Sequence, residues 1–288
     1  MILSYLQLPA VQHALVAAAL VAVTCGVVST FVVTRTMAFA VHGTAELAFT
    51  GAAAGLLIAN NAIAGALLGS LVVATFLGVL GVRERDRDVS TGVVLAAGLA
   101  LGVLLLSYYQ GFASAATNIL FGNIFGVSTS QLVLLSAISV CVLVVLAVVG
   151  RPLLFASVDP DVARARGVRT GLLGIVFLFV LAITVTEAAQ IVGTLLVLSL
   201  AITPAAAAQR LSASPVVVTV LSVVMAVVAA DGGLLLSFQF TTVKPSVLIV
   251  AVSFAFYVVA RVVGPALTRR RRQERQGGVT ELAELQHG

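Results

Sequence analysis

Two side chains that could bind a metal ion lie four residues apart in an apolar stretch of the sequence. His42 and Glu46 fall within FAVHGTAELAFTG, residues 39–51. Residues i and i+4 of a helix share one face, and an imidazole nitrogen and a carboxylate oxygen both bind zinc or manganese. The pair could therefore hold a divalent cation, or it could form a buried Glu–His hydrogen bond that joins two helices.

The surrounding chain is too apolar for a water-soluble domain. Of its 288 residues, 60% are apolar and 9% are charged, whereas a soluble domain carries roughly 25% charged residues. Apolar runs of about 20 residues cross a bilayer as helices. The composition predicts an all-α, polytopic membrane protein, in which a charged side chain is expected to face a polar pathway or a partner.

About nine apolar runs could form membrane-spanning helices, and the last one ends near residue 266. We place them at residues 10–34, 38–58, 61–82, 91–108, 130–150, 171–187, 189–209, 214–234 and 245–266. We therefore predict one membrane domain over residues 1–266 and a basic tail over residues 267–288. Cys25 and Cys141 lie in apolar runs and are expected to be core residues.

The basic residues predict how the chain is oriented. Of the 16 Lys and Arg residues, all but Lys244 fall at alternate ends of these runs. Because loops rich in Lys and Arg stay in the cytoplasm, we expect the N-terminus outside and the C-terminus in the cytoplasm. The arginines of RRRRQER, residues 269–275, are expected to lie against anionic lipid. The positive charge therefore requires no nucleic-acid partner.

A short cytoplasmic helix is predicted at about residues 159–167, between two of the runs. Asp159 can cap its N-terminus, Pro160 suits its first position, and Gly167 suits the position after its end. Charged residues complement the helix dipole at both ends: Asp161, Arg164 and Arg166. This helix is either a capped connector or a docking element for a cytoplasmic partner.

Two further features could belong to a transport pathway. Gly193 and Pro204 interrupt the apolar segment 190–211, and a proline removes a backbone hydrogen bond and tends to kink a helix. This segment is either a tightly packed helix or a gate. Glu187 and Asp231 fall near the predicted outer ends of two runs, where they are either solvated or receive a cation from outside.

No catalytic motif is present in the sequence. Lys244 follows Val243, so the chain lacks the G-x-x-x-x-G-K-[ST] loop that binds nucleotide phosphates. It also lacks H-E-x-x-H and G-x-S-x-G. We expect no enzyme and no bound cofactor, and any ATPase that drives transport must be another chain.

Four segments occur in an order that resembles a known family. They are VVTRTMAFAVHGTAELAFTGAAAG (32–55), DPDVARARGV (159–168), VGTLLVLSLAITPAAAAQRL (192–211) and KPSVLIVAVSFAFYV (244–258). Together they resemble the membrane permease subunits of bacterial ABC importers for zinc, manganese and iron(II).

The resemblance implies a multi-pass permease of the bacterial cytoplasmic membrane that transports a divalent metal ion. It implies a homodimer with two cytoplasmic ATPase subunits and an extracytoplasmic metal-binding protein. It also implies that Asp159 to Gly167 form the coupling helix that enters a cleft on the ATPase, and that the segment around Pro204 lines the pathway near the dimer axis.

One departure from the family concerns the first pair. The second span of the family usually reads G-D-x-x-x-H-x-x-x-x-G. With Gly51 as the anchor, His42 takes the place of the aspartate and Glu46 that of the histidine, so the two ligand types are exchanged. We expect the pair to be a metal waypoint, with zinc as the first expected ion, manganese second and iron(II) third. The alternative is an ATP-independent secondary cation transporter that uses Glu46.

Overall fold

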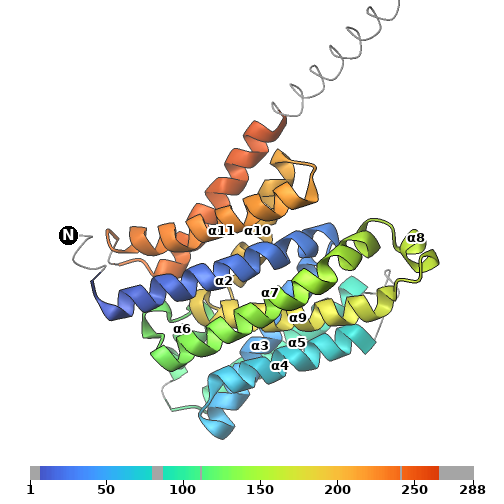
Figure 1. The fold of residues 1–288 in the computed structure, drawn as a ribbon. Coiled ribbons are helices and arrows are strands. Elements are labelled where there is room, and N and C mark those ends of the chain that lie inside the picture. The colour runs from blue at the N-terminus through green and yellow to red at the C-terminus, as the bar shows by residue number, and fades with distance from the viewer. Residues whose placement is uncertain (1–6, 80–86, 111, 241, 266–288) are drawn as a thin grey trace, which may run out of the picture.

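The structure is a computed structural model that describes residues 7–79, 87–110, 112–240 and 242–265. In this part of the chain every regular element is a helix (Figure 1), which confirms the all-α prediction. In chain order the elements are α2 (Pro9–Thr34), α3 (Ala38–Ala59), α4 (Ala62–Val79), α5 (Arg87–Ser107), α6 (Phe112–Phe121), the 3-10 turn η1 (Ile124–Gly126), α7 (Thr129–Val158), α8 (Pro160–Ala165), α9 (Thr170–Val192), α10 (Val197–Leu211), α11 (Pro215–Ser237) and a C-terminal helix, Pro245–Pro265.

Nine apolar helices in the described residues correspond to the nine predicted runs. Six are long and apolar enough to cross a membrane by length and composition: α2, α3, α7, α9, α11 and the C-terminal helix. The other three, in α4, α5 and α10, are shorter. Which end of the bundle faces the cytoplasm stays a prediction. The basic tail, 267–288, and residues 83–86, between the third and fourth predicted runs, lie outside the described residues.

Several helix boundaries differ from the prediction. Helix α7 continues to Val158 instead of ending near residue 150, because it runs through Pro152 and buries Leu153 beyond it. Helix α9 continues to Val192, and α10 begins only at Val197. The short α6 and the turn η1 were not predicted. Their segment is too short to span a bilayer.

The centre of the bundle is built from α2 and α9. In each of them 67% of the residues in the most apolar stretch of 18 residues are buried. In α7 the share is 22%, and its outer face is apolar and exposed. Helix α2 begins at the end of the bundle opposite to α8, and α7 runs between these two ends (Figure 1). A membrane helix with an exposed apolar face is expected to face lipid. The two central helices are therefore the ones shielded by protein on most sides.

Helices α3 and α4 cross with their backbones in direct contact. Gly51 and Gly55 of α3 face Gly65 and Gly69 of α4, and a Cβ added at Gly51 would lie 2.2 Å from the carbonyl oxygen of Gly65. Added at Gly65, it would lie 2.2 Å from the carbonyl oxygen of Gly51. Small residues at such spacing allow close helix packing in membranes. No side chain fits between the two helices at this crossing.

Candidate functional site

The pair predicted to bind metal lies near the start of α3. His42 Nε2 is 3.1 Å from Glu46 Oε1, so the two side chains share one face and contact each other directly. The distance fits a hydrogen bond. Because both residues belong to α3, this contact does not join two helices, as the hydrogen-bond alternative had supposed.

The pair faces away from α4. From His42 to Gly51, at the α3–α4 crossing, is about two and a half turns of an α-helix, which places the two residues on opposite sides of α3. The His42 side chain is 42% exposed and the Glu46 side chain is 18% exposed. In this single chain the pair is therefore partly open at the surface.

The pair can supply only part of a metal site. The second ring nitrogen of His42, Nδ1, is buried, and the structure gives it no hydrogen-bond partner. Because Nδ1 is enclosed by protein atoms in this structure, the donor atoms that the pair can present to an ion are Nε2 and the Glu46 carboxylate. The described residues contain no group of three or more His, Cys, Asp and Glu side chains that could hold one ion. Further ligands must come from water, from backbone carbonyls or from another chain.

The short helix predicted near residues 159–167 is confirmed as α8, and its caps are those expected from the sequence. Asp159 is the N-cap and accepts a hydrogen bond from the Val162 N–H at 3.0 Å. Gly167 ends the helix with φ +81° and donates its N–H to the Arg164 carbonyl at 2.9 Å. Asp161 and Arg164 form an exposed ion pair, 3.3 Å apart.

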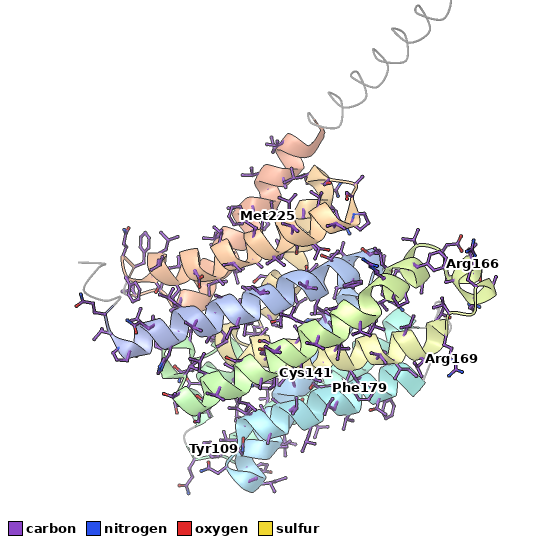
Figure 2. The ribbon with its side chains drawn as sticks, viewed as in Figure 1. Tyr109, Cys141, Arg166, Arg169, Phe179 and Met225 are labelled. Carbon is purple, nitrogen blue, oxygen red and sulfur yellow. The ribbon has the colours of Figure 1, made fainter. Side chains whose placement is uncertain are left out.

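Helix α8 lies at one end of the molecule. Figure 2 shows Arg166 on it and Arg169 in the following segment, both at that end of the bundle. The segment has exposed charged side chains of both signs. Its position and charge suit contact with a soluble partner, although its caps and its ion pair all lie within the segment.

Gly193 and Pro204 interrupt the helical course in different ways. Helix α9 stops before Gly193, which adopts φ +94°, and the next two residues donate their N–H groups to carbonyls of α6, Thr194 to Ile119 and Leu195 to Leu120. Pro204 instead lies inside α10. The break therefore falls at the glycine, and the proline is held within a continuous helix.

Ser29 of α2 makes hydrogen bonds to the backbone on both sides of Pro204, and sequence reasoning missed it. Its hydroxyl donates to the Ile202 carbonyl at 3.2 Å and accepts from the Ala205 N–H at 3.3 Å. Both backbone groups lie next to Pro204, where the regular hydrogen-bond ladder is disturbed. A serine within an apolar run was the available signal, but no local pattern links it to a residue so distant in sequence.

The two acidic residues predicted near the outer ends of spans do not form one site. Glu187 of α9 is 1% exposed and accepts a hydrogen bond from Ser139 of α7. Asp231 of α11 is partly exposed, with one buried oxygen, Oδ1, that has no hydrogen-bond partner in the structure. Lys244, just before the C-terminal helix, places Nζ 4.9 Å from the centre of the Phe121 ring.

Two cavities lie beside the end of α9 that carries Glu187. One, of about 280 Å³, is lined by Glu187 itself, by Asn61 and by residues of α4, α7 and α9. The other, of about 190 Å³, lies under α6 and η1 and includes Asn118, Asn123 and Gln131 among its lining residues. Thr186 and Gln190 line both cavities. Thr186 and Gln190 are polar residues near the end of an apolar run. They were visible in the sequence, and the sequence analysis did not use them.

Comparison with known proteins identifies relatives over almost the whole chain. The profile of the ABC 3 transport family matches residues 7–264. The chain is 30% identical over 246 residues to the manganese transport system membrane protein MntC of Halalkalibacterium halodurans, covering 85% of this chain and 84% of that protein. It is 28% identical over 258 residues to the manganese import system permease protein ScaB of Streptococcus parasanguinis, covering 88% and 90%.

A solved structure has the same fold. The structure described as PsaBC from Streptococcus pneumoniae in complex with Fab contains a chain that superposes with a TM-score of 0.84 at 24% identity, covering 94% of this chain and 98% of that one. A second structure, described as an inward-facing conformation of a putative metal-chelate type ABC transporter, gives 0.65 at 13% identity.

Proposed function

Because this chain belongs to the ABC 3 transport family, as the multi-pass membrane permease of an ABC metal importer, we propose that the ion it carries is manganese(II). The observation that carries this proposal is the similarity to proteins named as manganese transport and import permeases, along most of both chains. Zinc, the first expectation from the sequence, has no comparable support. Manganese, the second expectation from the sequence, is therefore the proposed ion.

The donor atoms of the pair on α3 are compatible with this ion. Carboxylate oxygens suit manganese, and imidazole nitrogen is an accepted transition-metal ligand. We propose that His42 and Glu46 form a waypoint for the ion. Two copies of α3 facing each other across a dimer axis would supply up to four such ligands. Their partial exposure in the single chain supports a position that a second copy covers.

The remaining partners follow from the class of transporter. A permease of an ABC importer works with ATPase subunits and with a binding protein that delivers the ion. We propose two cytoplasmic ATPase subunits and a metal-binding protein on the outer side. Helix α8 would dock on the ATPase, because it is capped at both ends, exposed and charged. Family membership also favours this arrangement over a secondary transporter.

The gate is proposed at α10. This helix begins after the break at Gly193 and contains Pro204, and the Ser29 hydroxyl holds the backbone beside that proline. A helix with a disturbed hydrogen-bond ladder bends more easily than a regular one. Movement of α10 would need to break only the two hydrogen bonds between Ser29 and the α10 backbone.

Transport by the reconstituted importer tests the choice of ion. The permease, its ATPase and its binding protein are placed in liposomes, and ATP-dependent uptake of Mn²⁺ and Zn²⁺ is measured separately and in competition. We expect Mn²⁺ uptake that excess Zn²⁺ inhibits poorly. Uptake of Zn²⁺ that exceeds Mn²⁺ under the same conditions would restore the first expectation, and uptake of either ion without ATP would restore the secondary transporter.

A further inference from the structure

The Glu187 carboxyl is buried among helices and is only partly satisfied by protein groups. Its Oε1 accepts a hydrogen bond from Ser139 of α7, while its Oε2 is buried and has no hydrogen-bond partner in the structure. The side chain of Thr24, on α2, also lies beside the carboxyl. An acidic side chain inside a membrane protein is costly and usually serves transport. The negative charge of the Glu187 carboxylate must therefore be balanced by a bound cation or removed by a proton.

The surroundings of Glu187 offer oxygen donors and space. The cavity of about 280 Å³ that Glu187 lines also has Asn61, Gln190 and Thr186 in its wall, among mainly apolar residues. The Thr186 hydroxyl donates to Ser70 at 2.7 Å, which leaves its oxygen able to accept. A water molecule takes about 30 Å³ in the liquid. The cavity can therefore hold a cation together with several of its waters.

We propose that Glu187 and the amide and hydroxyl oxygens around it form a second site for a divalent cation, distinct from His42 and Glu46. One carboxylate, neutral oxygens and retained water are the ligands that Mg²⁺, Ca²⁺ and Mn²⁺ prefer. A single negative charge leaves a divalent ion incompletely neutralised, so binding is weak and reversible. The identification of the ion as Mn²⁺ rests on the proposed function.

The two sites lie toward opposite ends of the bundle. Glu187 is near the C-terminal end of α9, and Ala52, near the C-terminal end of α3, lines the adjoining cavity. His42 is ten residues before Ala52, which corresponds to about 15 Å along a helix. In the predicted orientation, Glu187 lies toward the outer side. It would hold the ion before His42 and Glu46 do.

Counting bound Mn²⁺ tests the second site without relying on uptake. The purified complex of permease and ATPase is titrated with Mn²⁺, and free ion is followed by its electron paramagnetic resonance signal. We expect two kinds of site in the wild type: one at Glu187 of each permease, and the waypoint that the two permease copies share. Glu187→Gln should lose one of them, because glutamine keeps the size of the side chain and an oxygen for Ser139 but removes the charge. Asp231→Asn, on α11, removes an equal charge that lines neither cavity, and both sites should remain.

The outcomes separate this site from the proposed waypoint. Loss of one site in Glu187→Gln alone, with the other lost only in the double variant His42→Ala, Glu46→Gln, supports two separate sites. Two sites retained in Glu187→Gln would mean that Glu187 is a neutral structural acid, and the inference would be overturned even if Mn²⁺ transport stands. If Mn²⁺ transport fails but Glu187→Gln still removes a site, only the proposed function is lost.

A second variant guards against misfolding of Glu187→Gln. Gln190→Leu leaves the carboxyl and its bond to Ser139 intact and removes one oxygen from the cavity wall. We expect the affinity of the Glu187 site for Mn²⁺ to fall about tenfold, in the range seen when groups that support a metal site are removed. An unchanged affinity in a folded Gln190→Leu protein would count against a cation in this cavity.

Discussion

At the scale of single residues, the exchanged pair on α3 makes the sharpest prediction. His42→Ala and Glu46→Gln each remove one ligand type from every copy, so uptake per folded protein should fall by about tenfold or more in each. The double exchange, His42→Asp with Glu46→His, restores the order usual in the family on the same helix face. It should retain appreciable transport, with an altered preference among metal ions.

The measurement is metal uptake divided by the amount of folded protein for all three variants. A structural role for the 3.1 Å contact would lower yield and thermal stability instead of transport per molecule. Near-normal transport per folded molecule in both single variants would end the waypoint proposal, whatever the double variant did.

The sequence was informative about this pair because helix periodicity alone brings residues i and i+4 together. It was much less informative about Glu187. The bond from Ser139 and the wall formed by Asn61 depend on how α4, α7 and α9 pack, and no local pattern encodes that packing. An acidic residue near the end of an apolar run was expected at the interface, and the structure buries it instead.

At the scale of the elements, α8 should transmit the action of the ATPase. Gly167→Pro should uncouple ATP hydrolysis from transport, since proline fixes φ near −65° and removes the N–H that Gly167, at φ +81°, donates to Arg164. Arg164→Glu with Arg166→Glu should do the same by reversing the charge of the helix. Uptake and ATPase activity of the reconstituted complex are the measurements.

Gly167→Asn is the matched control for the backbone argument. A Cβ at position 167 would meet nothing within 4 Å, and asparagine tolerates a positive φ better than most residues. Coupling should therefore survive in this variant. Normal uptake in Gly167→Pro and in the charge-reversed variant, with ATPase binding unchanged, would refute the docking role.

Helix α8 was predictable because its caps lie within nine residues of sequence, from Asp159 to Gly167. The ends of α9 and α10 were less predictable. The segment after Gly193 is fixed by hydrogen bonds to α6, and the backbone beside Pro204 by Ser29 of α2. Both sets of contacts join residues far apart in the chain. An apolar run of this length can be divided correctly only when its neighbours are known.

At the scale of the whole molecule, the orientation in the membrane can be tested at the two ends of α7. On a background without Cys25 and Cys141, Arg164→Cys beyond its C-terminal end should be protected from a membrane-impermeant thiol reagent in intact cells. Thr129→Cys, at its N-terminal end, should react. Both positions are exposed in the structure, so a difference between them reports the side of the membrane.

Permeabilised cells supply the control, since both cysteines should then react. Strong labelling of Arg164→Cys in intact cells would reverse the topology and place α8 on the side opposite to the ATPase. The orientation was predicted from the positions of the arginines in the loops. The packing of the helices would be the same in either orientation, so the fold does not decide between the two.

The glycine contact between α3 and α4 has a mechanical consequence. The backbones of the two helices touch at Gly51 and Gly65. If one helix slid along the other, a larger residue would enter this contact, so the two helices are expected to move together. His42 lies on one side of this crossing, and Asn61, at the turn between the helices, lies on the other side. Because the crossing holds the two helices together as one rigid unit, a movement of α3 at His42 also moves Asn61 and with it the wall beside Glu187.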